Sequence, residues 1–147
     1  MGPLNIPNSG IVYVDTQVLI YSIEKICPYF DLLVPLWEAS ESGRLEILTS
    51  ELAIVEVLTG PFKKADKQLI GVYDELINGT DLQLVPIDRE ILQTAAKLRA
   101  QTSLRTPDAI HAATAISVDC SAFVTNDTGF RSVSSLPVII LKDSVPI

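Results

Sequence analysis

Short, strongly apolar segments alternate with longer helical patterns along the chain, and this alternation limits the possible folds more than any other feature. The first segment, residues 11–14, is rich in β-branched side chains and stops abruptly at Asp15. Apolar strands without polar alternation are buried on both faces, so they predict an α/β fold with a mostly parallel sheet covered by helices on both faces. The five predicted strands are residues 11–14, 45–48, 82–85, 121–125 and 137–141.

Helical patterns fill the intervals between the predicted strands, and residues that stop or cap helices mark several of their ends. Gly60 and Pro61 form a strong stop signal, so the helix that begins at residue 51 is expected to end just before them. Thr106 is expected to cap a later helix that has Pro107 at its first position. The predicted helices cover residues 18–22, 30–40, 51–59, 62–78, 88–99 and 107–118.

Composition and charge narrow the class of protein. The chain has 147 residues, which suits a single domain spanning residues 1–147, and its 48% hydrophobic and 20% charged content is that of a globular protein. A net charge of −7 excludes a uniformly basic coat for nucleic acid, and the absence of long Lys or Arg runs excludes a polybasic membrane-surface segment. The sequence also lacks an apolar stretch long enough to span a bilayer, so no membrane association is expected.

The cysteines and the single histidine argue against a zinc centre. Cys27 and Cys120 have no neighbouring histidine in the sequence, and His111 cannot complete a zinc site alone. Because both cysteines lie beside apolar residues, we interpret them as free, buried thiols in a reducing compartment. The N-terminal residues show no secretory signal, so a cytoplasmic location is expected.

Three aspartates occur where the chain leaves a predicted strand or enters a predicted helix. Asp15 follows the first strand, Asp127 follows the fourth, and Asp108 lies in the first turn of a helix. Each has a purely structural explanation: Asp15 can cap a helix, Asp127 can form a turn, and Asp108 suits the positive end of a helix dipole. In a parallel sheet, however, these positions lie on the same edge, where ligands bind.

Glu56 is a fourth acid, and its surroundings require a partner. It lies in the segment 52–58, which is apolar on nearly every side, and a helix that is apolar all round is buried. Because burying an unpaired charge is costly, Glu56 is expected to bind a partner or a cation. Four carboxylates in one cleft would repel one another, and oxygen ligands without His or Cys select Mg²⁺ or Mn²⁺. Such an ion can activate water and stabilise charge on a phosphate.

Four stretches of the sequence together resemble the PIN-domain family, most closely the VapC-like toxins of bacterial and archaeal toxin–antitoxin pairs. They follow the family's order over almost the whole chain, and the blocks PDAIHAATA and TND..F are the most specific parts. The resemblance implies a Rossmann-like, three-layer α/β/α sandwich with a mostly parallel five-stranded sheet. It also implies a metal-dependent endoribonuclease that acts on RNA, forms a homodimer and is neutralised by a cognate antitoxin. The four stretches are residues 14–16, 49–58, 106–115 and 124–130.

Carried over position by position, the resemblance places the family's catalytic and metal-binding quartet on Asp15, Glu56, Asp108 and Asp127. The implied cofactor is Mg²⁺ or Mn²⁺, held by these four carboxylates. Gln17 departs from the Ser or Asn of many members, which weakens a role for that position and leaves the quartet complete. Three accessory residues are expected beside the metal, namely Thr16, Thr125 and Asn126.

Two other classes of function are compatible with the same residues. The first is a non-catalytic PIN-like module that binds RNA or a protein. The second is a metal-dependent phosphatase or DNA nuclease, since the same acids could serve either reaction. A nucleotide cofactor is not expected, because the sequence contains no Walker phosphate loop and no Gly-x-Gly-x-x-Gly motif after the first strand.

One histidine and one apolar stripe each allow two interpretations. His111 follows Asp108 by one helical turn, and a structural or hydrogen-bonding role is favoured over catalysis. The stripe at helical spacing within residues 62–78 is more often part of a core than a partner surface, although an antitoxin could bind such a face. The stripe consists of Leu69, Tyr73 and Leu76.

The basic residues are few, and two groups of them could meet RNA. Lys63, Lys64 and Lys67 form the densest basic patch, which is either a solvated helix face or a contact with the RNA backbone. Arg105 and Arg131 flank two of the acidic motifs and could contact phosphates. Without the four site acids the chain has 14 acidic and 11 basic residues, so over half of its net negative charge is assigned to the predicted metal site.

Overall fold

The computed structural model describes residues 4–145 and contains a five-stranded sheet in which every strand pairing is parallel. The strands lie in the order β3-β2-β1-β4-β5. All five predicted strands are confirmed, and the sheet is parallel throughout. Their bounds are β1 (Gly10–Val14), β2 (Leu45–Ser50), β3 (Gln83–Val85), β4 (Ala122–Thr125) and β5 (Val138–Ile140).

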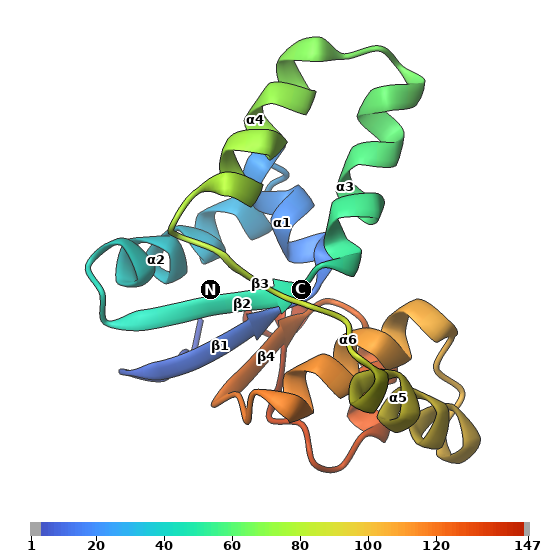
Figure 1. Ribbon diagram of the computed structural model, residues 1–147. Helices are drawn as coiled ribbons and strands as arrows, with labels where there is room; N and C mark the ends of the chain where they lie inside the picture. The colour runs from blue at the N-terminus through green and yellow to red at the C-terminus, as the bar shows by residue number, and fades with distance from the viewer. Residues whose placement is uncertain (1–3, 146–147) are drawn as a thin grey trace.

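Helices cover both faces of this sheet and complete three layers, as predicted (Figure 1). Two short 3-10 helices follow the last two strands: η1 (Thr128–Ser132) and η2 (Leu141–Ser144). One face is covered by α1 (Thr16–Ile23), α2 (Tyr29–Glu41), α3 (Leu52–Lys63) and α4 (Lys67–Asn78). The other face is covered by α5 (Arg89–Gln101) and α6 (Thr106–Ser117).

The central strand β1 shows how one short segment serves both layers. Val12 and Val14 belong to the core beneath α1 to α4, whereas Tyr13 between them belongs to the core beneath α5 and α6. All three residues are completely buried. Because successive side chains of a strand point to opposite faces, a strand in the middle of a covered sheet needs a buried side chain at every position. The unbroken run at residues 11–14 is therefore the mark of a central strand.

The strand order places a crevice at the carboxyl edge of the sheet, between β1 and β4. From β1 the chain passes to β2 and β3 on one side, and it then crosses to β4 and β5 on the other. The connections that follow β1 and β4 therefore diverge, and such a switch point is where open α/β sheets bind ligands. Asp15 comes directly after β1, and Asp127 comes two residues after β4.

The predicted helix stop at Gly60 and Pro61 is wrong. α3 continues through both residues to Lys63, and Pro61 is buried. Proline has no N–H, so this turn lacks the hydrogen bond that residue 61 would donate to the Val57 carbonyl, and α3 ends two residues later. The chain leaves the helix where Ala65 adopts a left-handed conformation with φ 51°, and α4 begins at Lys67 instead of residue 62.

Two other helix starts lie within one residue of their predicted positions. Asp88 caps α5, as expected, because its Oδ1 accepts a hydrogen bond from the Ile91 N–H at 2.8 Å. Thr106 is the first residue of α6 and not its cap, and Arg105 before it makes no side-chain capping hydrogen bond. The Arg105 side chain therefore makes no capping hydrogen bond with the first turn of α6.

Two predictions about burial have different outcomes. The stripe on α4 is part of the core, since Tyr73 is completely buried and both Leu69 and Leu76 pack against the same cluster. The two cysteines are free, but only Cys120 is buried. Cys27 is exposed, contrary to the prediction, because it lies in the connection between α1 and α2 and not inside either helix.

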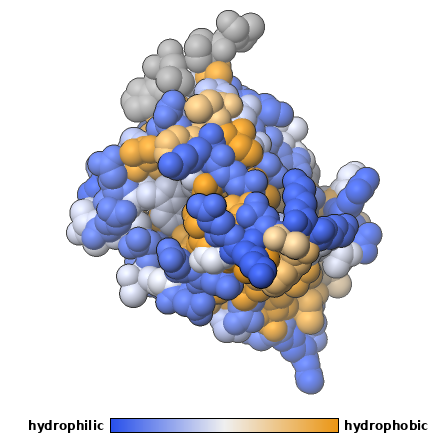
Figure 2. All heavy atoms as spheres, turned by 90° about the horizontal axis from the view of Figure 1, so that it is seen from above, coloured by the Kyte–Doolittle hydropathy of each residue, from blue (hydrophilic) through white to orange (hydrophobic). Residues whose placement is uncertain are grey.

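The face seen from above is largely hydrophilic, with hydrophobic side chains exposed in patches (Figure 2). Val55 and Phe62 of α3 are among the exposed side chains, at 63% and 61%. The prediction that the segment 52–58 is buried all round is therefore wrong. α3 buries one side through Ala53 and Val57 and leaves the opposite side in solvent. Within the described chain, no helix combines the length and the apolar character that a bilayer crossing needs.

Candidate functional site

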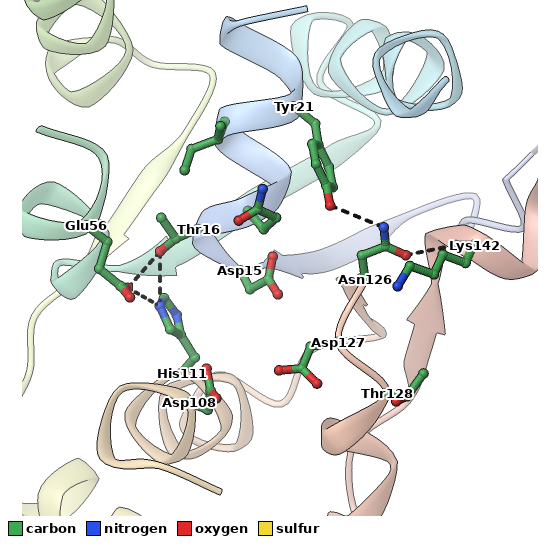
Figure 3. A pocket seen from close by; sticks show the side chains of 12 residues that line it. Asp15, Thr16, Tyr21, Glu56, Asp108, His111, Asn126, Asp127, Thr128 and Lys142 are labelled. Atoms are coloured by element: carbon green, nitrogen blue, oxygen red, sulfur yellow. Dashed lines mark hydrogen bonds and ion pairs between the residues drawn. The ribbon is translucent and has the colours of Figure 1, made fainter. Parts of the chain in front are cut away.

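A cleft of about 550 Å³ opens at the carboxyl edge of the sheet, and most of its lining residues are polar. Figure 3 shows side chains from α1, α3, α6 and the end of β4 converging on it. Thr16 and Asn126 also line the cleft, while Thr125 lies beneath it, bonded to one of the acids. The cleft brings together all four acids predicted from the sequence: Asp15, Glu56, Asp108 and Asp127.

Asp15 is the most buried of these acids, and it has two functions in the fold. Its Oδ1 accepts from the Val18 N–H at 3.2 Å and caps α1, while its Oδ2 accepts a short hydrogen bond from the Thr125 hydroxyl. Burial raises the pKa of Asp15 to about 6, against the hydrogen bond from Thr125 and the attraction of His111, which both lower it. The ionised side chain is thus held at a desolvation cost that a bound cation would relieve.

Asp108 and Asp127 reach the cleft from α6 and from the end of β4. Asp127 shapes a turn, since its Oδ1 accepts from the Gly129 N–H at 2.8 Å and its own N–H donates to the Thr125 hydroxyl at 3.0 Å. Asp108 is half-buried in the first turn of its helix. Desolvation raises the pKa of Asp108, and the negative charge of Asp127 raises it further. These two carboxylates are therefore close enough to repel each other.

Glu56 is held by two side chains from other elements. Its Oε1 accepts a hydrogen bond from the Thr16 hydroxyl at 2.8 Å and lies 2.7 Å from Nε2 of His111 (Figure 3). Partial burial raises the pKa of Glu56, but the hydrogen bond and charge attraction of His111, together with the hydrogen bond from Thr16, outweigh burial and lower it. The partner predicted for Glu56 thus exists, and His111 takes the hydrogen-bonding role that was favoured for it.

Asn126 connects the end of β4 to two neighbouring elements. Its Nδ2 donates to the Tyr21 hydroxyl of α1 at 3.2 Å, and its Oδ1 accepts from the Lys142 N–H of η2 at 3.0 Å. Both ends of the amide are engaged. Asn126 therefore positions α1 and η2 around the cleft by hydrogen bonding.

Two residues that shape the site were not predicted from the sequence. The Tyr13 hydroxyl contacts Nδ1 of His111 at 2.6 Å from inside the sheet, and Lys142 lines the cleft across from Glu56 (Figure 3). A signal was available for Tyr13, because a phenolic hydroxyl in a buried aliphatic strand needs a hydrogen-bonding partner. Lys142 carries no comparable signal, since only folding returns the segment after β5 to the acids.

The chemistry of these donors suits a hard divalent cation. Among residues 4–145, none of the three aspartates forms an ion pair with Lys or Arg, although they share one cleft. Their oxygen atoms are the ligand type that Mg²⁺ and Mn²⁺ prefer. In the part of the chain that is described, no three His, Cys, Asp or Glu side chains are grouped closely enough to enclose an ion. Mg²⁺ usually keeps several water ligands and needs only one or two carboxylates, so a partly hydrated ion fits this arrangement.

The basic residues that the sequence suggested as RNA contacts lie in three different environments. Arg105 lines a second cavity of about 390 Å³, which shares Asp108 and Asp127 with the main cleft. Arg131 is engaged elsewhere, since its Nη2 lies 2.7 Å from Oδ2 of Asp143. The lysine patch of the sequence analysis lies where α3 ends and α4 begins, and all of its members are exposed. That patch lines neither cavity: Lys63, Lys64 and Lys67.

Comparison with protein families gives a match to the PIN domain over residues 12–136, which is most of the chain. The match covers all four cleft acids, the strands β2, β3 and β4, and the last three residues of β1. No curated protein matches the sequence at a significant level.

Solved structures with a similar fold include chains from Rickettsia felis, Klebsiella pneumoniae and Neisseria gonorrhoeae. A chain of VapBC2 from Rickettsia felis, bound to a DNA fragment from its promoter, superposes with a TM-score of 0.70 at 20% identity, covering 88% of this chain and 98% of that one. A toxin–antitoxin complex from Klebsiella pneumoniae gives 0.65 at 21%, covering 88% and 97%. FitAcB from Neisseria gonorrhoeae gives 0.65 at 18%, covering 89% and 98%. At these sequence identities the comparisons establish a shared fold alone.

Proposed function

The chain belongs to the PIN domain family, and on this premise we propose that it is a metal-dependent endoribonuclease that cleaves RNA phosphodiester bonds. The observation that carries the proposal is the convergence of Asp15, Asp108 and Asp127 in one cleft, where none of them is paired with Lys or Arg among the described residues. A cluster of carboxylates without a cationic partner is costly to ionise, and a divalent ion offsets that cost.

The roles of the four acids follow from their surroundings. Asp15, Asp108 and Asp127 would hold Mg²⁺ or Mn²⁺, which when bound would stabilise charge on the scissile phosphate and favour ionisation of water. Glu56 has a lowered pKa and stays ionised at neutral pH, so it can accept a hydrogen bond from the attacking water and orient it. In-line attack forms one bond from water oxygen to phosphorus and breaks the bond to the ribose oxygen, which takes up a proton.

Removal of divalent metal is expected to abolish RNA cleavage. The purified protein should cut single-stranded RNA in Mn²⁺ or Mg²⁺, lose activity in EDTA and recover it when excess Mn²⁺ is restored. The same ion should raise the melting temperature, because a ligand that binds only the folded state stabilises that state. Gel analysis of labelled RNA and a thermal melt provide the two measurements.

Three results of this experiment would change the proposal. Cleavage that persists in EDTA would contradict a metal requirement. Binding of RNA without cleavage at any metal concentration would favour the non-catalytic module. Parallel assays on single-stranded DNA and on a phosphomonoester separate a ribonuclease from a DNA nuclease or phosphatase, since those substrates should remain intact.

Arg105 is placed to bind an RNA phosphate next to the cleavage site. It lines the cavity that adjoins the acids, and the hydroxyls of Ser103, Thr128 and Ser132 line the same cavity. Guanidinium and hydroxyl groups are common donors to phosphate oxygens, and such contacts position the backbone without reading the sequence. We therefore place the nucleotide beside the scissile bond in this second cavity.

Arg105→Gln is expected to raise the KM for RNA by about tenfold with a smaller change in kcat, since a charge-assisted hydrogen bond contributes about 1.5–3 kcal/mol. The slope of log affinity against log salt should fall by about 0.7 for one lost contact with single-stranded RNA. Arg131→Gln is the matched control, because it removes the same charge from a side chain that binds Asp143. Equal losses in the two variants would show that only overall charge matters.

We also propose that the protein acts in the cytoplasm as a homodimeric toxin with a cognate antitoxin. The support is the likeness of fold to chains from VapBC2, FitAcB and a toxin–antitoxin complex. The net charge of −7 and the acidic cleft would suit a basic antitoxin segment that covers the acids. Co-purification of this chain with the product of a neighbouring gene, with loss of cleavage in the complex, tests the pairing.

A further inference from the structure

His111 is a buried histidine with three polar partners from three different elements. The residue is 2% exposed and lies on α6, among alanines that pack against the sheet. Its Nδ1 is 2.6 Å from the Tyr13 hydroxyl. Its Nε2 is 2.7 Å from Glu56 Oε1 and 3.1 Å from the Thr16 hydroxyl (Figure 3). A buried imidazole is stable only when its polar atoms are bonded, and both ring nitrogens meet this condition.

The contacts of Glu56 and Tyr13 together fix which ring nitrogen of His111 carries the proton, because the Glu56 carboxylate can only accept a hydrogen bond from Nε2. The phenolic oxygen already accepts from the Ser50 N–H at 3.0 Å, so its own proton is available for His111 Nδ1. An Nδ1 that accepts this proton leaves the imidazole proton on Nε2, where it is donated to Glu56. Tyr13 cannot turn away, because it is completely buried and stacked on Phe123 at 5.2 Å with an interplanar angle of 5°.

Glu56 depends on these contacts for its place in the cleft. It projects from α3, a helix with one face in solvent, and its side chain is 31% exposed. A glutamate with several rotatable bonds in such a position would otherwise be free to turn outwards. Both hydrogen bonds that hold it end on Oε1, one from Thr16 and one from His111. The other carboxylate oxygen, Oε2, is not used by either bond.

We propose that Tyr13 and His111 form a relay of positioning residues that holds the Glu56 carboxylate at the cleft and leaves Oε2 available to orient the attacking water. The relay runs from the sheet through α6 to α3, so the packed interior sets the position of a side chain on the surface. The catalytic consequence rests on the proposed function, whereas the hydrogen-bonding consequence does not.

Two substitutions at His111 separate its two contacts. The amide nitrogen of His111→Gln can occupy the place of Nε2 and keep the donation to Glu56. The shorter side chain of His111→Asn reaches only the place of Nδ1, where its amide oxygen can accept from the Tyr13 hydroxyl. His111→Asn is expected to lower kcat by about 10- to 100-fold with little change in KM, the usual range for residues that orient a metal-site group. His111→Gln should retain about tenfold more activity than His111→Asn, although both disturb the core.

A double-mutant cycle tests whether His111 acts through Glu56. In a Glu56→Gln background, His111→Asn should cause little further loss, because the carboxylate that it positions is already gone. Losses that multiply would show that His111 contributes independently and would overturn the relay. Equal loss in His111→Gln and His111→Asn, with equal melting temperatures, would do the same.

NMR spectroscopy of the imidazole tests the relay independently of RNA cleavage. His111 is the only histidine of the chain, so its imidazole ¹⁵N signals are assigned without ambiguity. At pH 8 the wild type should show a proton on Nε2 and none on Nδ1, and both Glu56→Gln and Tyr13→Phe should shift these signals. A proton on Nδ1, or imidazole ¹⁵N signals that do not shift in Glu56→Gln, would overturn the relay. A protein with the expected spectrum that fails to cut RNA would overturn the proposed function and leave the relay standing.

Discussion

Asp108→Asn is expected to reduce RNA cleavage by at least about 100-fold while the protein stays folded, because even residues that only support a metal site change activity by 10- to 100-fold. Asn keeps the shape of the side chain and removes the charge that would hold the cation. Asp108 is half-buried, caps no helix and has a pKa raised by desolvation and by Asp127. Loss of its charge should therefore not weaken the fold.

Single-turnover cleavage of labelled RNA in Mn²⁺ and calorimetric titration with Mn²⁺ alone measure this effect. Expression in cells gives a further readout, since growth arrest by the wild type should vanish with Asp108→Asn. Asp66→Asn is the matched control, because Asp66 caps α4 away from the cleft and Asn is an equally good cap. Activity of Asp108→Asn within about threefold of this control would remove Asp108 from the site.

Asp15→Asn is expected to make the metal-free protein more stable and to abolish its activity. Burial raises the pKa of Asp15 from 3.8 to about 6, so the folded protein holds this proton more tightly than the unfolded chain does. Its ionisation therefore costs nothing well below pH 3.8, costs progressively more as the pH rises towards 6, and reaches its full cost above that. At about 1.4 kcal/mol per pKa unit the shift corresponds to about 3 kcal/mol at pH 7, and loss of the hydrogen bond from Thr125 costs about 1 kcal/mol, so the expected net gain is roughly 2 kcal/mol.

Thermal melts in EDTA between pH 4 and pH 8 test this prediction. The variant should melt about 4–8 °C above the wild type at pH 7, and the gap should close towards pH 4. Asp88→Asn provides the control, because Asp88 caps α5 as Asp15 caps α1 but lies outside the cleft. A variant that is less stable than wild type at every pH would show that the lost hydrogen-bond acceptor outweighs the relieved burial.

The two substitutions together describe a site in which function opposes stability. A carboxylate that binds a cation must be ionised in the folded protein before the cation arrives. Asp15 meets this requirement at a cost because it is only 7% exposed and its nearest donors are the Thr125 hydroxyl and the Val18 N–H. Natural proteins commonly accept such a loss of stability at their active sites.

Much of the fold could be read from local patterns in the sequence. The unbroken apolar run at residues 11–14 predicts a strand buried on both faces, and β1 is the central strand of a covered parallel sheet. The acids Asp15 and Asp127 follow strands whose carboxyl ends meet at one edge, so their convergence follows from strand direction alone. The helix end predicted at Pro61 is wrong because Pro61 is buried by tertiary packing, and local helix propensity does not include that contribution.

The partners of individual side chains could not be predicted, because they come from segments that are far apart in the sequence. The charge and spacing of Arg105 and Arg131 made them equivalent candidates for phosphate contacts. Folding brings Asp143 to Arg131 and leaves Arg105 beside the acids. Likewise Glu56 was expected to need a partner, but only the packing of α6 against α3 and β1 shows that this partner is His111.

The sequence alone was sufficient for the parallel sheet, for its two helical layers and for the four acids at one edge, because periodic burial and strand direction are local properties of the chain. The tertiary structure was needed for the hydrogen bonds of His111, for those of Asn126, and for the different surroundings of Arg105 and Arg131. These depend on distances between residues up to 105 positions apart, as for Tyr21 and Asn126, which no local pattern records. The gathering of the four acids in one cleft was thus foreseeable, whereas the support that holds Glu56 in place was not.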